Sequence, residues 1–272
     1  MFRRHIRPRS SRLVERRRRL LLFRFGGALA LVGILVGLLW WGATRPALQI
    51  QDIAVSGNEV VTADEIKSIA GRVLSGTYFF LFPKSNTLWY PQGDIEATIL
   101  SSFERLKEVS VSRENLTGIS ITVAERSPAS LWCRELGNVT CYFLNDEGLI
   151  FAKAPDFTGN VFFRFYGGIE ASDPIGKTYL QEHEEFSRAI GFIEALRGVG
   201  LLPIELRVVN GEDMELIMED GTRVLISRNR DFSETFENLK IVLDSETFKK
   251  RAGLDIDYLD LRFGNKIYFK LQ

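Results

Sequence analysis

The chain of 272 residues carries 35 Lys and Arg against 35 Asp and Glu, so its formal net charge is zero. The charges are unevenly distributed along the chain, because the first 24 residues hold ten of the Lys and Arg residues and only one of the Asp and Glu residues. The acidic remainder argues against a nucleic-acid partner for the folded part, since phosphate binding requires clustered cations. With only two cysteines, a four-cysteine zinc site lacks half its ligands.

One apolar stretch near the N-terminus, residues 25–43, contains no charged residue. As a helix with a rise of ~1.5 Å per residue it is ~28 Å long, close to the ~30 Å hydrocarbon core of a bilayer. Ten Arg residues precede it and only Arg45 follows closely, so the positive-inside rule places the N-terminus in the cytoplasm. We therefore expect a cytoplasmic tail over residues 1–24 and a transmembrane helix over residues 25–44, in contact with membrane lipid.

The residues at the C-terminal end of this stretch distinguish a retained membrane anchor from a cleaved signal peptide. Trp40 and Trp41 favour the headgroup zone at the end of a spanning helix. A signal peptide needs small residues before its cleavage site, and the Trp-Gly-Ala sequence here fits that pattern poorly. Gly33 and Gly37 form a G-x-x-x-G match, which permits close approach of a second helix but also occurs by chance. We expect a single-pass anchor of the cytoplasmic membrane, with the bulk of the chain outside the cytoplasm.

The next part of the chain alternates between strand and helix patterns. Thr62 and Glu65 have the spacing of a capping box, and the helix that they start ends at Gly76. The other predicted elements are a strand over residues 49–56, a helix over 94–103 with Asp94 as its N-cap, and strands over 108–113 and 118–125.

An apolar segment, Tyr78 to Phe82 (YFFLF), interrupts this region where a connector is expected. Packing against the domain is the simpler interpretation. Partial insertion in the membrane interface is the alternative, because almost no linker separates the anchor from the first strand.

The remainder of the chain is rich in strands. Predicted strands cover residues 130–133, 141–144, 149–151, 161–166, 206–209, 214–218 and 223–227, and predicted helices cover 179–196 and 232–243. Cys133 and Cys141 form a close pair beyond the anchor, where disulfides persist. We expect them to form a disulfide that ties a hairpin or loop.

Catalytic patterns are incomplete in this sequence. His183 starts a His-Glu-Glu sequence, but position 187 is Ser where a zinc protease needs a second histidine, so a solvated helix face explains it. The phosphate-loop match over residues 171–178 contains Pro174, which removes a backbone N–H that would bind phosphate. We expect no enzyme activity, no cofactor, no metal site and no small-molecule substrate.

Two groups of residues carry a family resemblance. Ile53-Ala-Val-Ser-Gly-Asn58, the capped helix, and the strand that ends in Glu125-Arg-Ser-Pro128 resemble the POTRA domain of the FtsQ/DivIB cell-division proteins. Residues 254–270 (LDIDYLDLRFGNKIYFK) resemble the segment that ends the β-domain of the same family. The resemblance implies an α+β fold with a small β-α-α-β-β POTRA domain over residues 48–128. A mixed, mainly antiparallel FtsQ-type β-domain with flanking helices would follow over residues 129–272.

The resemblance also implies a non-catalytic divisome scaffold at the division septum, which recruits FtsB/DivIC-like and FtsL-like membrane-anchored proteins. The docking surface would be the edge near the last strand. Arg262 would offer a charged fork to an acidic partner residue and Phe263 an aromatic anchor, with Tyr268 and Phe269 completing the surface or filling the core. Asp260 would brace the turn. The alternative is a POTRA-containing chaperone or scaffold in envelope protein assembly or secretion.

Overall fold

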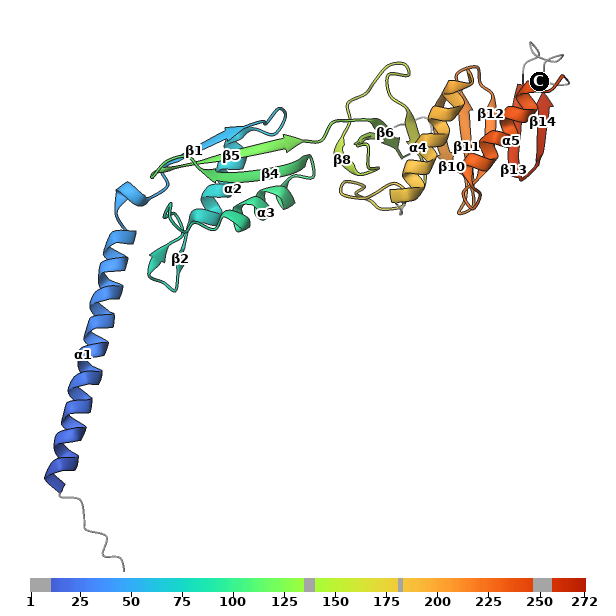
Figure 1. The fold of residues 1–272 in the computed structure, drawn as a ribbon. Helices are drawn as coiled ribbons and strands as arrows, with labels where there is room; N and C mark the ends of the chain where they lie inside the picture. Colours follow the sequence, from blue (N-terminus) through green and yellow to red (C-terminus); the bar gives the residue numbers. More distant parts are fainter. Residues whose placement is uncertain (1–10, 135–139, 181–182, 247–255) are drawn as a thin grey trace, which may run out of the picture. The chain divides into compact units, whose positions relative to one another are not determined.

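The computed structural model describes residues 11–134, 140–180, 183–246 and 256–272, with the side chains of residues 11–15, 17 and 183 left undescribed. Two compact units make up the chain. The first comprises Met1–Ser102 with Glu108–Ala124, and the second Phe103–Lys107 with Glu125–Gln272 (Figure 1). The expected α+β class is confirmed, with an N-terminal apolar helix, a small first domain and a mixed sheet with flanking helices.

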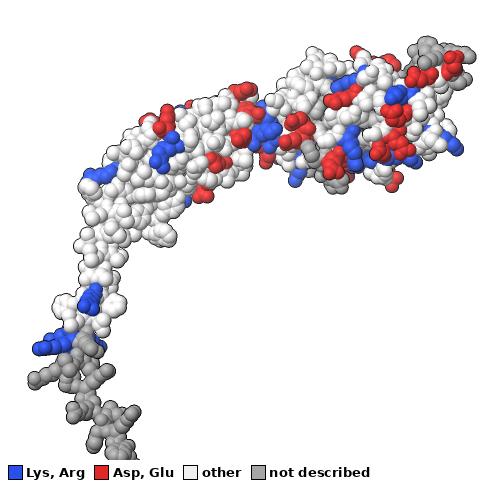
Figure 2. Space-filling view, in the orientation of Figure 1, with Lys and Arg blue, Asp and Glu red and all other residues white. Residues whose placement is uncertain are grey.

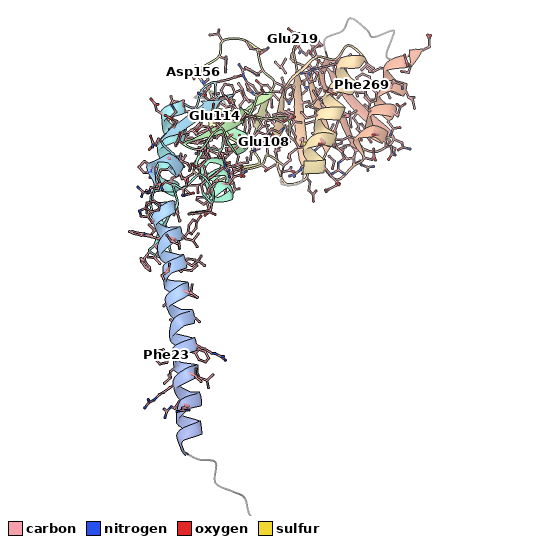
Figure 3. The ribbon with its side chains drawn as sticks, turned by 60° about the vertical axis from the view of Figure 1, so that its left-hand side comes forward. Phe23, Glu108, Glu114, Asp156, Glu219 and Phe269 are labelled. Atoms are coloured by element: carbon pink, nitrogen blue, oxygen red, sulfur yellow. A yellow bond between two sulfur atoms is a disulfide. The ribbon has the colours of Figure 1, made fainter. Side chains whose placement is uncertain are left out.

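The first element is a long helix, α1 (Ser11–Ala43). Its segment Arg18–Ala43 contains an 18-residue window with a mean hydropathy of 2.2 and is long and apolar enough to cross a membrane. Its side chains point outward around the helix, as labelled Phe23 does in Figure 3, and the surface above its basic end is uncharged in Figure 2. This helix suggests a single-pass membrane anchor. It begins before the predicted span because arginine is a good helix former.

The C-terminal end of α1 is hydrogen-bonded to the domain that follows it. Ala43 is 2% exposed, and its carbonyl accepts hydrogen bonds from Gln49 Nε2 at 2.6 Å and from Asn86 Nδ2 at 3.0 Å. Asn86 itself is fully buried. Helix ends leave carbonyl groups without helical partners, so these two amides satisfy one that would otherwise be orphaned.

A three-stranded sheet with the order β1-β5-β4 forms the first unit together with two helices. After the 3-10 helix η1 (Pro46–Leu48), the elements are β1 (Asp52–Ser56), α2 (Ala63–Leu74), α3 (Gln92–Ser102), β4 (Leu106–Arg113) and β5 (Gly118–Glu125). The predicted capping box is present, because Glu65 N donates to the Thr62 hydroxyl and Thr62 N to the Glu65 carboxylate. The predicted N-cap at Asp94 is wrong: α3 starts two residues earlier, directly after Pro91, and Asp94 lies in its first turn.

The YFFLF segment forms a two-stranded hairpin of β2 (Thr77–Tyr78) and β3 (Phe82–Pro83). At its tip, Phe79 is 87% exposed and Phe80 is 98% exposed. The prediction that this segment packs against the domain is therefore wrong for both rings. Both residues also have positive φ, 50° and 62°, a left-handed conformation that bulky side chains rarely adopt.

A nine-stranded sheet organises the second unit, with the order β14-β13-β12-β11-β10-β9-β6-β7-β8. Its strands are β6 (Ser130–Cys133), β7 (Cys141–Leu144), β8 (Ile150–Lys153), β9 (Arg164–Tyr166), β10 (Pro203–Val208), β11 (Asp213–Met218), β12 (Arg223–Ser227), β13 (Ile256–Phe263) and β14 (Lys266–Leu271). Three neighbouring pairs are parallel, β6 with β9, β9 with β10 and β12 with β13, and the others are antiparallel. The sheet is therefore mixed and mostly antiparallel, as expected.

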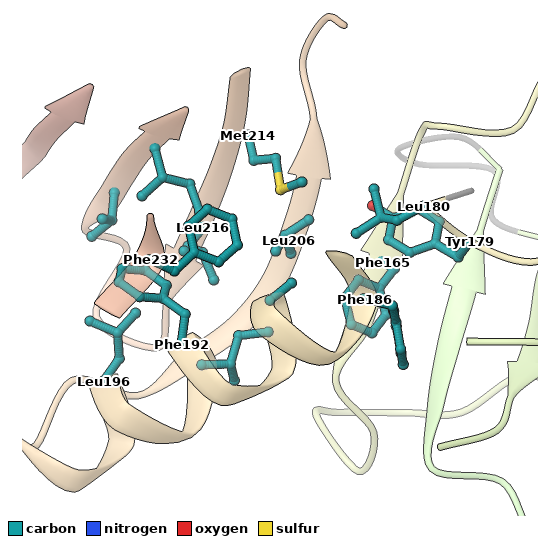
Figure 4. Packing of buried hydrophobic residues seen from close by; sticks show 14 of the residues in the cluster. Phe165, Tyr179, Leu180, Phe186, Phe192, Leu196, Leu206, Met214, Leu216 and Phe232 are labelled. Carbon is teal, nitrogen blue, oxygen red and sulfur yellow. The ribbon is translucent and has the colours of Figure 1, made fainter. Parts of the chain in front are cut away.

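Two helices, α4 (His183–Gly198) and α5 (Phe232–Asp244), cover one face of this sheet. Figure 4 shows Phe192 and Leu196 of α4 packed towards Leu206 and Leu216 of the strands, with Phe232 beside them. Alternating buried residues along β11 and β12 supply much of the strand side of this core, because successive side chains point to opposite faces.

On the opposite face, a smaller cluster packs around the two cysteines. Cys133 and Cys141 lie directly opposite each other on β6 and β7 and are joined by a disulfide with a Cα–Cα distance of 4.2 Å. The cluster consists of buried Leu131, Cys133, Ala154 and Tyr166, with Cys141, Phe143, Phe157 and Phe162 packed against it. Residues 154–162 thus cover this end of the sheet.

Candidate partner-binding edge of the second unit

The last two strands form a hairpin that ends the nine-stranded sheet. Among the described residues, β14 has a strand neighbour, β13, on one side only. The connecting turn includes Gly264 with φ 70°, the left-handed conformation that glycine adopts readily. Arg230 Nε donates to Arg262 O at 3.2 Å and Asn238 Nδ2 to Gly264 O at 3.4 Å, so the residue just before the N-cap of α5 and the middle of α5 hold this turn.

The guanidinium of Arg262 is engaged inside its own unit. Its Nε and Nη2 donate to the two carboxylate oxygens of Asp260 at 2.9 and 2.7 Å, and its Nη1 donates to Asp213 Oδ2 at 2.9 Å. The hydrogen bond with Asp260 and the charge of both carboxylates raise the pKa of Arg262 above its ordinary value. The fork predicted for an acidic partner residue is therefore occupied by two carboxylates of the chain itself.

Asp260 is the buried member of this group, with 6% of its surface exposed. Burial alone would raise the pKa of Asp260, but the hydrogen bonds from the Arg262 side chain and backbone hold it below the ordinary value. Its Oδ1 accepts from Arg262 N at 3.1 Å as well as from the guanidinium. This geometry agrees with a bracing role for Asp260, because the carboxylate fixes the backbone two residues before the turn.

Phe263 and Tyr268 form an exposed aromatic pair beside Arg262. Phe263 is 53% exposed and Tyr268 is 51% exposed. Their ring centroids are 5.4 Å apart at an interplanar angle of 87°, the edge-to-face arrangement that aromatic pairs favour. Arg262 also lies over the Phe263 ring, with 5.7 Å between its guanidinium carbon and the ring centroid. The pair presents apolar surface to solvent at the sheet edge.

Phe269 belongs to the other face of β14. Burial alternates along this strand, with Lys266, Tyr268 and Lys270 exposed and the intervening residues half-buried. Phe269 of β14 packs against the main core, and Figure 3 labels this residue. Of the four residues predicted to form one binding surface, the structure brings together Arg262, Phe263 and Tyr268, and places Phe269 on the core side.

A ladder of ion pairs, which the sequence interpretation missed, crosses the sheet face opposite the helices. It runs over five strands from β14 to β10 and consists of Lys270, Asp257, Arg223, Glu215, Arg207 and Glu205. The closest contacts are 2.7 Å between Arg223 and Asp257 and 2.6 Å between Arg207 and Glu205. The signal was alternating charged residues in two strands, Glu205 and Arg207 in β10 and Asp213 and Glu215 in β11, and their ion-pair partners can be identified only from the strand order.

The sequence also raised the questions of a metal site and of His183. No group of three or more His, Cys, Asp or Glu side chains in the described part of the chain is placed to hold a metal ion. The side chain of His183, expected on a solvated helix face, lies outside the described residues.

Comparison with protein families identifies the first domain. Residues 48–126 match the family described as POTRA domain, FtsQ-type. No curated protein matches the chain.

Proposed function

Because an FtsQ-type POTRA domain follows an apolar N-terminal helix, the chain fits the FtsQ/DivIB family, and we propose that it is a membrane-anchored, non-catalytic divisome scaffold. This proposal rests on the match over residues 48–126, since the FtsQ-type POTRA domain is typical of a family of cell-division scaffold proteins. The scaffold would recruit FtsB/DivIC-like and FtsL-like membrane-anchored partners for septum formation.

The proposed topology follows from charge and hydropathy. The Arg-rich tail over residues 1–24 would lie in the cytoplasm and residues 25–44 would span the membrane. The POTRA domain over residues 48–128 and the β-domain over residues 129–272 would then lie outside the cytoplasm, where the disulfide between Cys133 and Cys141 is stable.

The proposed docking surface is the outer edge of β14 together with the pair formed by Phe263 and Tyr268. A terminal strand offers its backbone to an added strand, and side chains at alternate positions give specificity. Aromatic side chains that are half exposed before binding supply large apolar contact areas, which is why they are frequent interface hot spots. In this proposal Arg262 stabilises β13 and does not bind an acidic residue of the partner, because its N–H groups already donate to Asp260 and Asp213.

Localisation and depletion test the scaffold proposal in cells. A fluorescent fusion of the full chain should concentrate at the septum, and depletion should block division and produce filaments. A diffuse envelope signal together with normal division after depletion would refute the divisome assignment and favour the alternative role in envelope protein assembly.

Partner capture tests the docking surface. Phe263→Ala with Tyr268→Ser should weaken capture of the FtsB/DivIC-like partner by at least about tenfold, since hot-spot truncations cost more than ~1 kcal/mol each. The matched control is Val161→Ser, because Val161 is 68% exposed and lies just before β9, five strands away in the sheet order. Equal capture by the double variant and the control would show that the partner binds elsewhere.

A further inference from the structure

Exposed apolar residues of the first domain gather near the point where α1 ends. Beyond α1, the exposed large hydrophobic residues of the first unit are Val60, Phe79, Phe80, Leu81, Leu88, Trp89, Leu100 and Leu116. Most of them belong to two short segments, residues 79–81 at the hairpin tip and residues 88–89 just after it. We call these five residues the juxtamembrane patch.

Hydrogen bonds attach the chain between these two segments to the end of the helix. Asn86 Nδ2 donates to Ala43 O at 3.0 Å, and Thr87 N donates to Leu48 O at 2.9 Å. Ile50 N donates to the carbonyl of Ser85 at 2.8 Å. Strand β3 also packs against α1. The base of the hairpin is therefore fixed at the level of Ala43.

The length of the spanning helix places Ala43, and with it the base of the hairpin, at the membrane surface. The uncharged part of α1, residues 25–43, is ~28 Å long at ~1.5 Å per residue, close to the ~30 Å hydrocarbon core. When this part spans the core, Trp40 and Trp41 and the C-terminal end at Ala43 lie at the boundary with the headgroup layer. Phe80 and Asn86 are six positions apart in the sequence, which limits the distance between them to ~20 Å at 3.3–3.6 Å per residue. The hairpin tip is within reach of the bilayer interface.

The conformation of the tip gives a second, independent argument. Two consecutive left-handed residues in a hairpin turn are normally Asn-Gly or Asp-Gly, because those residues adopt positive φ without strain. Phe79 and Phe80 occupy these positions instead, and their rings are almost fully exposed. Neither turn geometry nor packing within the domain explains phenylalanine there, whereas contact with an apolar phase outside the domain does.

Neighbouring residues have the chemistry of the headgroup layer. Lys84 Nζ lies 5.6 Å from the centroid of the Tyr78 ring, and the guanidinium carbon of Arg45 lies 3.5 Å from the centroid of the Trp41 ring. Cations with long apolar stems beside tyrosine and tryptophan are typical of the membrane–water interface. Continuity with the spanning helix selects lipid over a protein partner as the occupant of the juxtamembrane patch.

We propose that the tip of the β2–β3 hairpin inserts Phe79 and Phe80 into the bilayer interface, with Leu81, Leu88 and Trp89 resting on it. This contact gives the POTRA domain a second attachment to the membrane besides α1. It does not depend on the divisome role, since it follows from the anchor and the exposed rings alone.

Spin labelling of the full chain tests the insertion. The native cysteines form a disulfide, so a label on Phe80→Cys is specific. The chain is placed, one copy per disc, in nanodiscs of phosphatidylcholine and phosphatidylglycerol. The matched control is Val60→Cys, because Val60 is 63% exposed in the same domain but lies beyond the far end of β1. The label at residue 80 should collide more with oxygen and less with a water-soluble nickel chelate than the label at residue 60.

Two results would overturn the proposal. The first is a residue 80 label as accessible to the nickel chelate as the control label. The second is a residue 80 label shielded from both reagents, which would indicate that protein covers the tip.

A turn replacement separates membrane contact from folding. Phe79→Asn with Phe80→Gly supplies residues that favour the same turn, so the thermal midpoint in detergent should be equal or higher. In nanodiscs, a Leu81→Cys label should be shielded from the nickel chelate in the parent chain and should lose that shielding in the replaced turn. A label that stays shielded without the two rings would show that they do not hold the hairpin in the bilayer.

Discussion

Arg262→Ala separates a bracing role of this arginine from a direct binding role. The substitution removes three side-chain hydrogen bonds and leaves the carboxylate of Asp260, 6% exposed, without its guanidinium partner. Removing one partner of a buried ion pair costs ~3–5 kcal/mol. The Arg262 side chain is 31% exposed, so solvent screening reduces the cost and we expect ~2–3 kcal/mol. For a unit of this size that lowers the thermal midpoint by about 5–10 °C.

The pH dependence of this loss identifies its cause. In the parent chain the lowered pKa of Asp260 stabilises the fold above its ordinary value of 3.8, and this stabilisation disappears as the pH falls through the lowered value. Without Arg262, burial raises the pKa of Asp260, so the variant loses stability as the pH rises above about 4. The difference between the two chains should therefore be largest near neutral pH and shrink below about pH 4.

A double-mutant cycle completes this experiment. The parent chain, Arg262→Ala, Asp260→Asn and the double variant are melted in detergent between acidic and neutral pH, with near-UV circular dichroism of the second unit as the signal. The double variant should recover part of the loss, because the amide needs no counter-charge. An Arg262→Ala variant that keeps parental stability at neutral pH yet loses partner capture would contradict the bracing role, since Arg262 would then bind the partner directly.

Three further substitutions test local features of the fold, each by the thermal midpoint of the full chain in detergent. Thr62→Ala removes the N-cap of α2 and should cost ~1 kcal/mol, whereas Thr62→Ser should cost little. Gly148→Ala should cost ~2–4 kcal/mol, because residue 148 has φ 82° and a Cβ there would lie 2.9 Å from the Phe186 ring; parental stability would mean that the turn relaxes. Replacing Cys133 and Cys141 by Ala should cost ~2 kcal/mol, and a reducing agent should then have no further effect; a further loss on reduction would contradict this.

Local sequence signals predicted where the helices and most strands of this fold occur, although α3 begins at Gln92 instead of Asp94 and α4 at His183 instead of Tyr179. Strand residues 130–133, 141–144 and 223–227 coincide with β6, β7 and β12, because alternation and turn residues mark both ends. The first predicted strand, over residues 49–56, was too long. Its initial part is held by hydrogen bonds from Ile50 N to Ser85 O and from Gln51 N to Thr117 O instead of by the sheet ladder, and no local pattern encodes those contacts.

Long-range contacts explain what sequence reasoning did not find in the candidate site. Asp213 and Arg262 are 49 positions apart, and only the strand order brings their charges to 2.9 Å. From the sequence alone, the guanidinium of Arg262 was therefore predicted to be available to an acidic partner residue. Similarly, Tyr268 and Phe269 are adjacent in sequence, and the alternation of β14 places them on opposite faces, but the choice of face depends on where α5 packs.

The occupied guanidinium changes the kind of recognition that the sheet edge can support. With Arg262 and the ladder from Lys270 to Glu205 neutralised by their own partners, the edge offers few uncompensated charges among the described residues. If the proposed partner docks at β14, its recognition rests on backbone hydrogen bonds and on the aromatic pair of Phe263 and Tyr268. Backbone pairing tolerates varied partner sequences, so the aromatic pair would supply the selectivity of the proposed docking edge. Because apolar contacts are not screened by salt, partner affinity would depend weakly on ionic strength.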